Sequence, residues 1–230
     1  MGEWSKAAAA AKTVLDSGNY TILEADGFVD SFKTDSAANS IFELAFSDTD
    51  NVGINGLGYI YRGENYGDIE VLPSVLQLYD TLDVRYKILG YEGDKLRNMG
   101  KYPELQGYDN VSVIRIEEVI LNYAEALFEQ GNAAGAIQQL NTITAKRGAG
   151  ATTYSNALTK EDILEERQRE LIFEGFRFFD LTRTQKGIPI VHSLQNIQTP
   201  ISANDHRFAL PIPLAKMDAN SNMEQNPGYN

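Results

Sequence analysis

The chain has 230 residues, and 43% hydrophobic with 10% aromatic residues is enough for a sizeable globular core. Its 20 basic and 32 acidic residues give a net charge of −12, which argues against nucleic acid as a partner because phosphate binding requires basic surfaces. The absence of cysteine excludes disulfides, thiolate catalysis and cysteine-based zinc sites, and two histidines leave little for another metal centre. We therefore expect no metal site and no cofactor.

The first half of the chain predicts few long elements. Residues 4–18 should form a helix, because an alanine run is followed by a Gly-Asn stop. A short strand is predicted at 41–46, where apolar residues alternate with others. A helix should restart at Pro73 and run to Asp80, whereas 90–110 is turn-rich and shows no clear element.

The stretch 47–72 is rich in Gly, Asn, Asp and Tyr and is predicted to be a long irregular loop with a function. Its start has part of the spacing of a calcium loop, but Val52 and Tyr59 stand where oxygen ligands are needed. Its glycines spell neither a dinucleotide fingerprint nor a phosphate-binding loop. The composition indicates a ligand-side surface loop without a metal ion.

The stretch 113–147 predicts two packed helices. Apolar residues recur at helical spacing on both sides of Gly131, and small residues stand where the helices would cross. This arrangement is similar to one tetratricopeptide repeat, and the helix at 4–18 looks like the second half of another. A stack of helical hairpins is therefore predicted.

A helix is predicted from about Lys160 to Arg183. Thr159 and Asp162 have the spacing of a capping box, in which each side chain satisfies the other's backbone N–H. Four phenylalanines between 173 and 179 surround acidic and basic residues, so some of these charges should be partly buried. We interpret this stretch as a structural docking surface rather than as a catalytic carboxylate site.

Several sequence blocks, in one order, resemble the C-terminal part of the RagB/SusD family. These blocks are SIFELAFS (40–47), LPSVLQLYD (72–80), DVRY (83–86), IRIEEVILNYAEALFEQG (114–131), AKRGAG (145–150), LTKEDILEERQRELIFEGFRFFDLTRT (158–184), LPIP (210–213) and QNPGY (225–229). The resemblance implies a mainly α fold, in which tetratricopeptide-like helical hairpins carry long irregular loops and a few short strands.

Family members are longer and begin with a signal peptide and a lipidated cysteine. We therefore expect residues 1–230 to form a single SusD-like domain that is an N-terminally truncated fragment. Its predicted parts are a repeat helix at 1–18, a loop-rich ligand-side insertion at 40–110, a tetratricopeptide-like hairpin at 113–147, and a C-terminal helix with a docked tail at 159–230.

The resemblance implies a surface-exposed outer-membrane lipoprotein that binds oligosaccharide or another nutrient and delivers it to a SusC-like TonB-dependent transporter. Neither catalysis nor a cofactor is implied, and the membrane is contacted only through a lipid anchor outside this chain. The alternative is a tetratricopeptide-type protein-interaction scaffold without a small-molecule ligand. That alternative requires a concave face with clustered polar residues, for which Asn122 and Asn141 are candidates.

A sugar presents an apolar C–H face and a ring of hydroxyls, so its site needs an aromatic platform beside hydrogen-bonding groups. The 47–72 loop has this composition. The predicted ligand-binding residues are Tyr59, Tyr61, Arg62, Asn65, Tyr66 and Asp68. The alternative is that the tyrosines anchor the loop to the scaffold.

Overall fold

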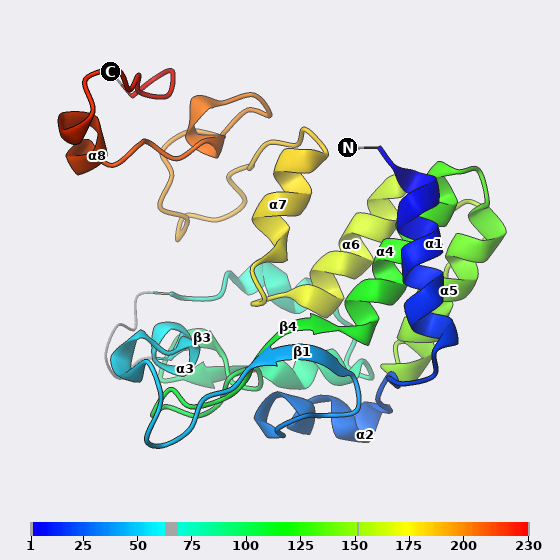
Figure 1. Cartoon of the computed structure of the whole chain (residues 1–230). Helices are drawn as coiled ribbons and strands as arrows, with labels where there is room; N and C mark the ends of the chain where they lie inside the picture. Colours follow the sequence, from blue (N-terminus) through cyan, green and yellow to red (C-terminus); the bar gives the residue numbers. More distant parts are fainter. Residues whose placement is uncertain (1, 63–68, 151, 230) are drawn as a thin grey trace. The chain divides into compact units, whose positions relative to one another are not determined.

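The computed structural model describes residues 2–62, 69–150 and 152–229, and the chain divides into two compact units, 1–174 and 175–230 (Figure 1). The helices are α1 (Trp4–Asp16), α2 (Ala25–Phe28), α3 (Leu57–Tyr61), α4 (Ile116–Glu129), α5 (Ala133–Lys146), α6 (Lys160–Leu171), α7 (Phe176–Arg183) and α8 (Leu214–Ala219). The strands are β1 (Ser40–Leu44), β2 (Leu89–Glu92), β3 (Lys95–Asn98) and β4 (Val111–Arg115). The predicted mainly α fold with few short strands is confirmed.

Helices α1, α5 and α6 pack against α4 in the first unit (Figure 1). The hairpin of α4 and α5 predicted at 113–147 is confirmed, and so is the helix at 4–18, which ends at Asp16. Ala124, Ala126 and Ala136 are fully buried, since small side chains let the helix backbones approach closely. The turn between α4 and α5 contains Gly131 at a φ of 81°, which favours glycine.

The predicted strand at 41–46 is confirmed as β1, which pairs antiparallel with β4. The helix predicted from residue 113 is therefore wrong at its start, because 111–115 is a strand and α4 begins at Ile116. The β-branched residues before Ile116 suit a pleated ribbon, and the pairing with β1 outweighs the helical spacing that continues into them.

The expectation that 90–110 holds no regular element is also wrong, because β2 and β3 form an antiparallel hairpin. A two-residue loop of Gly93 and Asp94 joins the strands, and Gly93 adopts a φ of 63° that most residues avoid. Each strand has only four residues, which is too short for a visible alternation in the sequence.

The 47–72 stretch is more regular than predicted, because it contains a 3₁₀ turn at Gly53–Asn55 followed by α3. Gly58 on α3 packs so closely that a Cβ there would lie 2.2 Å from the backbone oxygen of Glu104. The helix predicted from Pro73 is confirmed as a 3₁₀ helix, Pro73–Leu78. Because glycine has no side chain, the backbone of α3 can pack directly on the backbone at Glu104, and this contact orders a turn-rich segment.

The capping box at Thr159 and Asp162 is confirmed, but the single helix predicted up to Arg183 is not. Helix α6 ends at Leu171, and the chain then passes through Phe173 at a φ of 68° and Gly175 at 84° before α7 begins. This break coincides with the division between the two units.

The second unit contains α7, α8, a 3₁₀ helix at His206–Phe208 and segments without regular structure. In this unit the ring of Phe178 on α7 lies 5.7 Å from that of Phe208, so a tail residue contacts the helix. Asn226 donates a hydrogen bond to the backbone oxygen of Leu210 at 2.7 Å, which ties the end of the tail to its middle.

Candidate functional site

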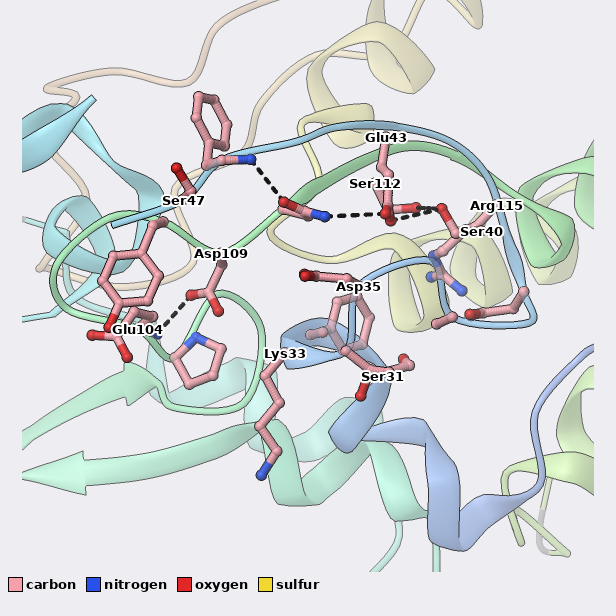
Figure 2. Close-up of a pocket in the computed structure, with 18 residues that line it drawn as sticks. Ser31, Lys33, Asp35, Ser40, Glu43, Ser47, Glu104, Asp109, Ser112 and Arg115 are labelled. Atoms are coloured by element: carbon pink, nitrogen blue, oxygen red, sulfur yellow. Dashed lines mark hydrogen bonds between the residues drawn. The ribbon is translucent and has the colours of Figure 1, made fainter. Parts of the chain in front are cut away.

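A cavity of about 530 Å³ lies in the first unit, between the ribbon of β1 and β4, the segment that follows α2 and the loop that precedes β4 (Figure 2). Its volume falls in the range of small-molecule sites. Its polar lining residues are Ser31, Lys33, Thr34, Asp35, Asn39, Ser40, Glu43, Ser47, Glu104, Asp109, Asn110, Ser112 and Arg115, and its aromatic ones are Phe32, Phe46 and Tyr108.

The two faces of the β1–β4 ribbon differ in polarity. Glu43 stands opposite Ser112 in the register and both line the cavity, as Figure 2 shows. Phe42 and Leu44 alternate with Glu43 along β1 and are 53% and 49% exposed. Ser40 also lines the cavity although it is three residues from Glu43, because the register of the ribbon shifts between these two residues.

Hydrogen bonds fix the Glu43 carboxylate in place. It accepts from the backbone N–H of Ser36 at 2.8 Å, from the Ser40 hydroxyl at 3.0 Å and from the Asn110 amide at 3.1 Å. Asn110 in turn accepts from the backbone N–H of Phe46 at 2.7 Å. This side of the cavity is preorganised, so a ligand need not order it on binding.

Asp109 lies in the opposite wall and accepts a hydrogen bond of 2.6 Å from the backbone N–H of Glu104. Burial raises the pKa of Asp109 to about 6, and the negative charges of Glu104 and Asp35 act in the same direction. The carboxyl group of Asp109 therefore titrates near neutral pH, unlike an exposed aspartate.

Arg115 joins the cavity to a buried charge cluster beneath it. Its guanidinium pairs with Glu117 at 3.0 Å, with Glu170 at 2.7 Å and with Glu174 at 2.8 Å. The other members of the buried charge cluster are Asp83, Arg85, Lys101, Arg147 and Glu166. The donors of Arg115 are thus used inside the protein.

Glu170 is the centre of the buried charge cluster and is fully buried. Its carboxylate lies 2.7 Å from Arg115, 3.0 Å from Arg147 and 3.3 Å from Arg85. Burial alone would raise the pKa of Glu170, but these three guanidinium groups hold it well below its usual range. The partial burial predicted for the charges among the phenylalanines is confirmed at Glu174 and Asp180, whose side chains are 2% and 4% exposed.

The sequence-predicted site residues lie outside the cavity or outside the described residues. Tyr61 donates a hydrogen bond of 2.9 Å to the backbone oxygen of Phe173, and its ring stacks on Tyr102 at 6.5 Å. Arg62 pairs with Glu92 at 3.3 Å, and Tyr59 is half-buried. Asn65, Tyr66 and Asp68 are outside the described residues.

The contacts of Tyr61 are those expected if it anchors the loop to the scaffold, which was the alternative role for the tyrosines. Of the described part of the 47–72 stretch, Ser47 does line the cavity. Sequence reasoning missed Glu43, Asp109 and Ser112. The alternation around Glu43 is visible in the sequence, but the helix predicted from 113 covers most of the partner strand β4, so the pairing of Glu43 with Ser112 is not predicted.

Neither a metal centre nor a membrane span is evident in the described parts of the chain. Across residues 2–62, 69–150 and 152–229, no three His, Asp or Glu side chains are grouped to hold a metal ion. None of the helices in these ranges is long and apolar enough to cross a bilayer.

Comparison with known proteins identifies relatives of this chain. Residues 77–229 match the model of the SusD family. The starch-binding protein SusD of Bacteroides thetaiotaomicron is 30% identical over 126 residues, which are 52% of this chain and 22% of that protein. SusD-like protein P2 of Formosa agariphila is 28% identical over 194 residues, which are 79% of this chain and 36% of that protein.

A solved structure of a candidate sugar-binding protein from Bacteroides vulgatus ATCC 8482 superposes over the whole chain with a TM-score of 0.89 at 30% identity. This chain covers 56% of that structure, so it spans about half the length of the solved relative and less of the curated ones.

Packed helical hairpins carry a polar cavity in their loop-rich part, on a tetratricopeptide-like scaffold. The chain belongs to the SusD family. The relatives reported above are described by name as starch-binding, sugar-binding or SusD-like proteins.

Proposed function

We propose that the chain is the part of a SusD-type glycan-binding protein that carries the glycan cavity. The observation that supports this proposal is the cavity of about 530 Å³, in which hydroxyl, amide and carboxylate groups stand beside aromatic rings in a SusD-family chain. The names of two relatives point the same way, since one is called starch-binding and another is described as a candidate sugar-binding protein.

The lining fits the chemistry of a sugar. Tyr108 and Phe46 can contact an apolar C–H face, while Glu43 and Asp109 can accept hydrogen bonds from ring hydroxyls. Because Glu43 is already held by three hydrogen bonds, its remaining acceptor capacity has a fixed direction. Fixed acceptors of this kind select the orientation of a hydroxyl.

The residues predicted from the sequence are proposed as a second ligand-contact region, of which 65, 66 and 68 lie outside the described residues. Tyr59, Tyr61, Arg62, Asn65, Tyr66 and Asp68 belong to it. In support, Gly58 on α3 packs directly against the backbone of Glu104, a residue of the cavity wall.

We also propose that residues 1–230 act as one SusD-like domain of a longer, lipid-anchored protein on the cell surface. In that setting the protein delivers oligosaccharide to a SusC-like TonB-dependent transporter. Affinity purification of the complete protein from outer membranes should co-purify such a transporter in stoichiometric amount. Purification of the intact lipoprotein alone, under conditions that keep outer-membrane complexes together, would contradict this partner.

The alternative of a peptide-binding scaffold is less well supported. Asn122 accepts a hydrogen bond of 2.7 Å from Arg167, and Asn141 makes two hydrogen bonds to the backbone of Tyr154. The two asparagines that this alternative would use are therefore engaged within the protein.

Titration calorimetry with a panel of neutral oligosaccharides tests the glycan-binding proposal. Ala37 lines the cavity and its neighbour Ala38 is exposed and does not, so Ala37→Trp and Ala38→Trp form a matched pair. We expect saturable binding that Ala37→Trp lowers at least tenfold and that Ala38→Trp leaves within twofold. Equal affinity of both variants would show that the cavity is not the glycan-binding site. The absence of binding to every oligosaccharide would reject the glycan-binding function.

A further inference from the structure

Four carboxylates line the cavity: Asp35, Glu43, Glu104 and Asp109. In the described part of the chain, none of these four has a Lys, Arg or His nitrogen within 4 Å. Of these four, Glu43, Glu104 and Asp109 are half-buried and Asp35 is exposed. Half-buried acidic groups are usually paired with a base, and most of the other buried and half-buried carboxylates among the described residues are. The cavity is therefore distinct from the buried charge cluster beneath it.

The two basic residues of the lining do not offset these charges. Lys33 extends to Asp30 at 2.8 Å on the surface, and that pair is more than half exposed. Arg115 is surrounded by Glu117, Glu170 and Glu174, whose charges outnumber its own. A ligand in the cavity consequently meets a negative field from four carboxylates and little from either base.

We propose that this cavity selects uncharged sugars and amino sugars and rejects glycans that carry carboxylate or sulfate groups. The inference rests on the proposed glycan-binding function and adds the charge class of the ligand. The hydroxyl and amide groups of the lining accommodate any sugar ring, so they do not decide between classes. The four carboxylates without a basic partner decide between neutral, cationic and anionic sugars.

An anionic substituent placed in the cavity loses hydration and gains no cationic partner, whereas the ammonium of an amino sugar gains acceptors. Two like charges a few ångströms apart repel more strongly at the dielectric constant typical of a protein surface than in bulk water. A discrimination of at least roughly tenfold between matched neutral and anionic sugars follows, because tenfold corresponds to about 1.4 kcal/mol.

Asp109 gives this selection a dependence on pH. The other ionisable groups around it are the three remaining carboxylates, Lys33, Arg115, Tyr102 and Tyr108. Because the pKa of Asp109 is about 6, its carboxyl gains a negative charge between pH 5 and pH 7. The affinity for an anionic sugar should then fall across this range, while that for an amino sugar should rise.

Calorimetry with three oligosaccharides of the same length and linkage tests the proposal. One is neutral, one carries a single uronic acid, and one carries a single free amino sugar. We expect the uronate to bind at least tenfold more weakly than the neutral ligand at pH 7, and the amino sugar at least as tightly as the neutral one. Equal or tighter binding of the uronate would overturn the charge selection and leave the glycan-binding function standing. No binding by any of the three would overturn both.

Two variants assign the effect to the cavity. Asp35→Asn removes one lining charge at a residue with no hydrogen bond or ion pair among the described contacts, and Asp94→Asn removes the same charge at an exposed turn outside the lining. We expect Asp35→Asn to narrow the neutral-to-uronate ratio at least threefold and Asp94→Asn to leave it unchanged. An equal change in both would show that net charge alone sets the preference, and would reject the assignment.

Discussion

Replacement of Glu170 by glutamine tests whether the buried charge cluster holds the first unit together. Glutamine has nearly the same shape, but it removes the negative charge that Arg85, Arg115 and Arg147 share and turns an NH₂ group towards one of them. These three guanidinium groups are at most 2% exposed and cannot recover hydration without opening the core. Removal of one partner from a buried pair costs about 3–5 kcal/mol, and we expect Glu170→Gln to lose an amount in this range.

The pH dependence of this loss has a definite sign. The pKa of Glu170 is held well below its ordinary value of 4.5 in the folded chain. Its stabilising contribution is therefore fully present above the unfolded pKa and disappears as the pH falls through the lowered folded pKa. The difference in unfolding free energy between wild type and Glu170→Gln should be constant from about pH 5.5 to 7 and should shrink below about pH 4.5.

Urea unfolding monitored by circular dichroism measures both effects. Glu165→Gln on the same helix is the control, because its pair with Arg169 at 3.0 Å leaves the carboxylate 55% exposed. An exposed pair is worth about 0–1 kcal/mol, so this control should change little. A loss below about 1 kcal/mol for Glu170→Gln, or one equal to that of Glu165→Gln, would refute the structural role of the cluster.

Two further predictions concern α3 and its neighbours. Tyr61→Phe should lower the free energy of unfolding by about 1 kcal/mol through loss of its hydrogen bond to Phe173, and Tyr61→Ala by about 3–5 kcal/mol through loss of its ring contacts, both measured by urea unfolding. An unchanged stability in both variants would contradict the anchoring role of Tyr61. Gly58→Ala should lower stability by about 1–3 kcal/mol and weaken glycan binding, because the added Cβ would lie 2.2 Å from the Glu104 oxygen in the cavity wall. Gly150→Ala is the control, since a Cβ at Gly150 has open space around it. Equal effects of the two substitutions in thermal unfolding would contradict this packing.

Helical periodicity and end signals made the helices readable from the sequence. The capping box at Thr159 placed the start of α6, and the glycine at 131 placed the turn between α4 and α5. Both signals are local, so they do not depend on distant parts of the chain. The break at Phe173 was not readable, because a positive φ at a phenylalanine has no signature in composition.

The strands and the cavity depend on contacts between distant residues. Ser112 lines the cavity only because β4 pairs with β1, about 70 residues earlier, and the helix-like spacing before Ile116 hid that strand. The partners of Glu174 are Lys101 and Arg115, which no helical spacing could indicate. The aromatic composition pointed to the 47–72 loop, but of its described residues only Ser47 lines the cavity, and Tyr61 hydrogen-bonds to the scaffold.

The most direct measurement is a crystal structure of this chain with a bound neutral oligosaccharide. We expect sugar density in the cavity beneath the β1–β4 ribbon, with a ring hydroxyl within hydrogen-bonding distance of Glu43 or Asp109. Density confined to another surface, with the cavity holding only solvent at a saturating ligand concentration, would contradict the proposed site.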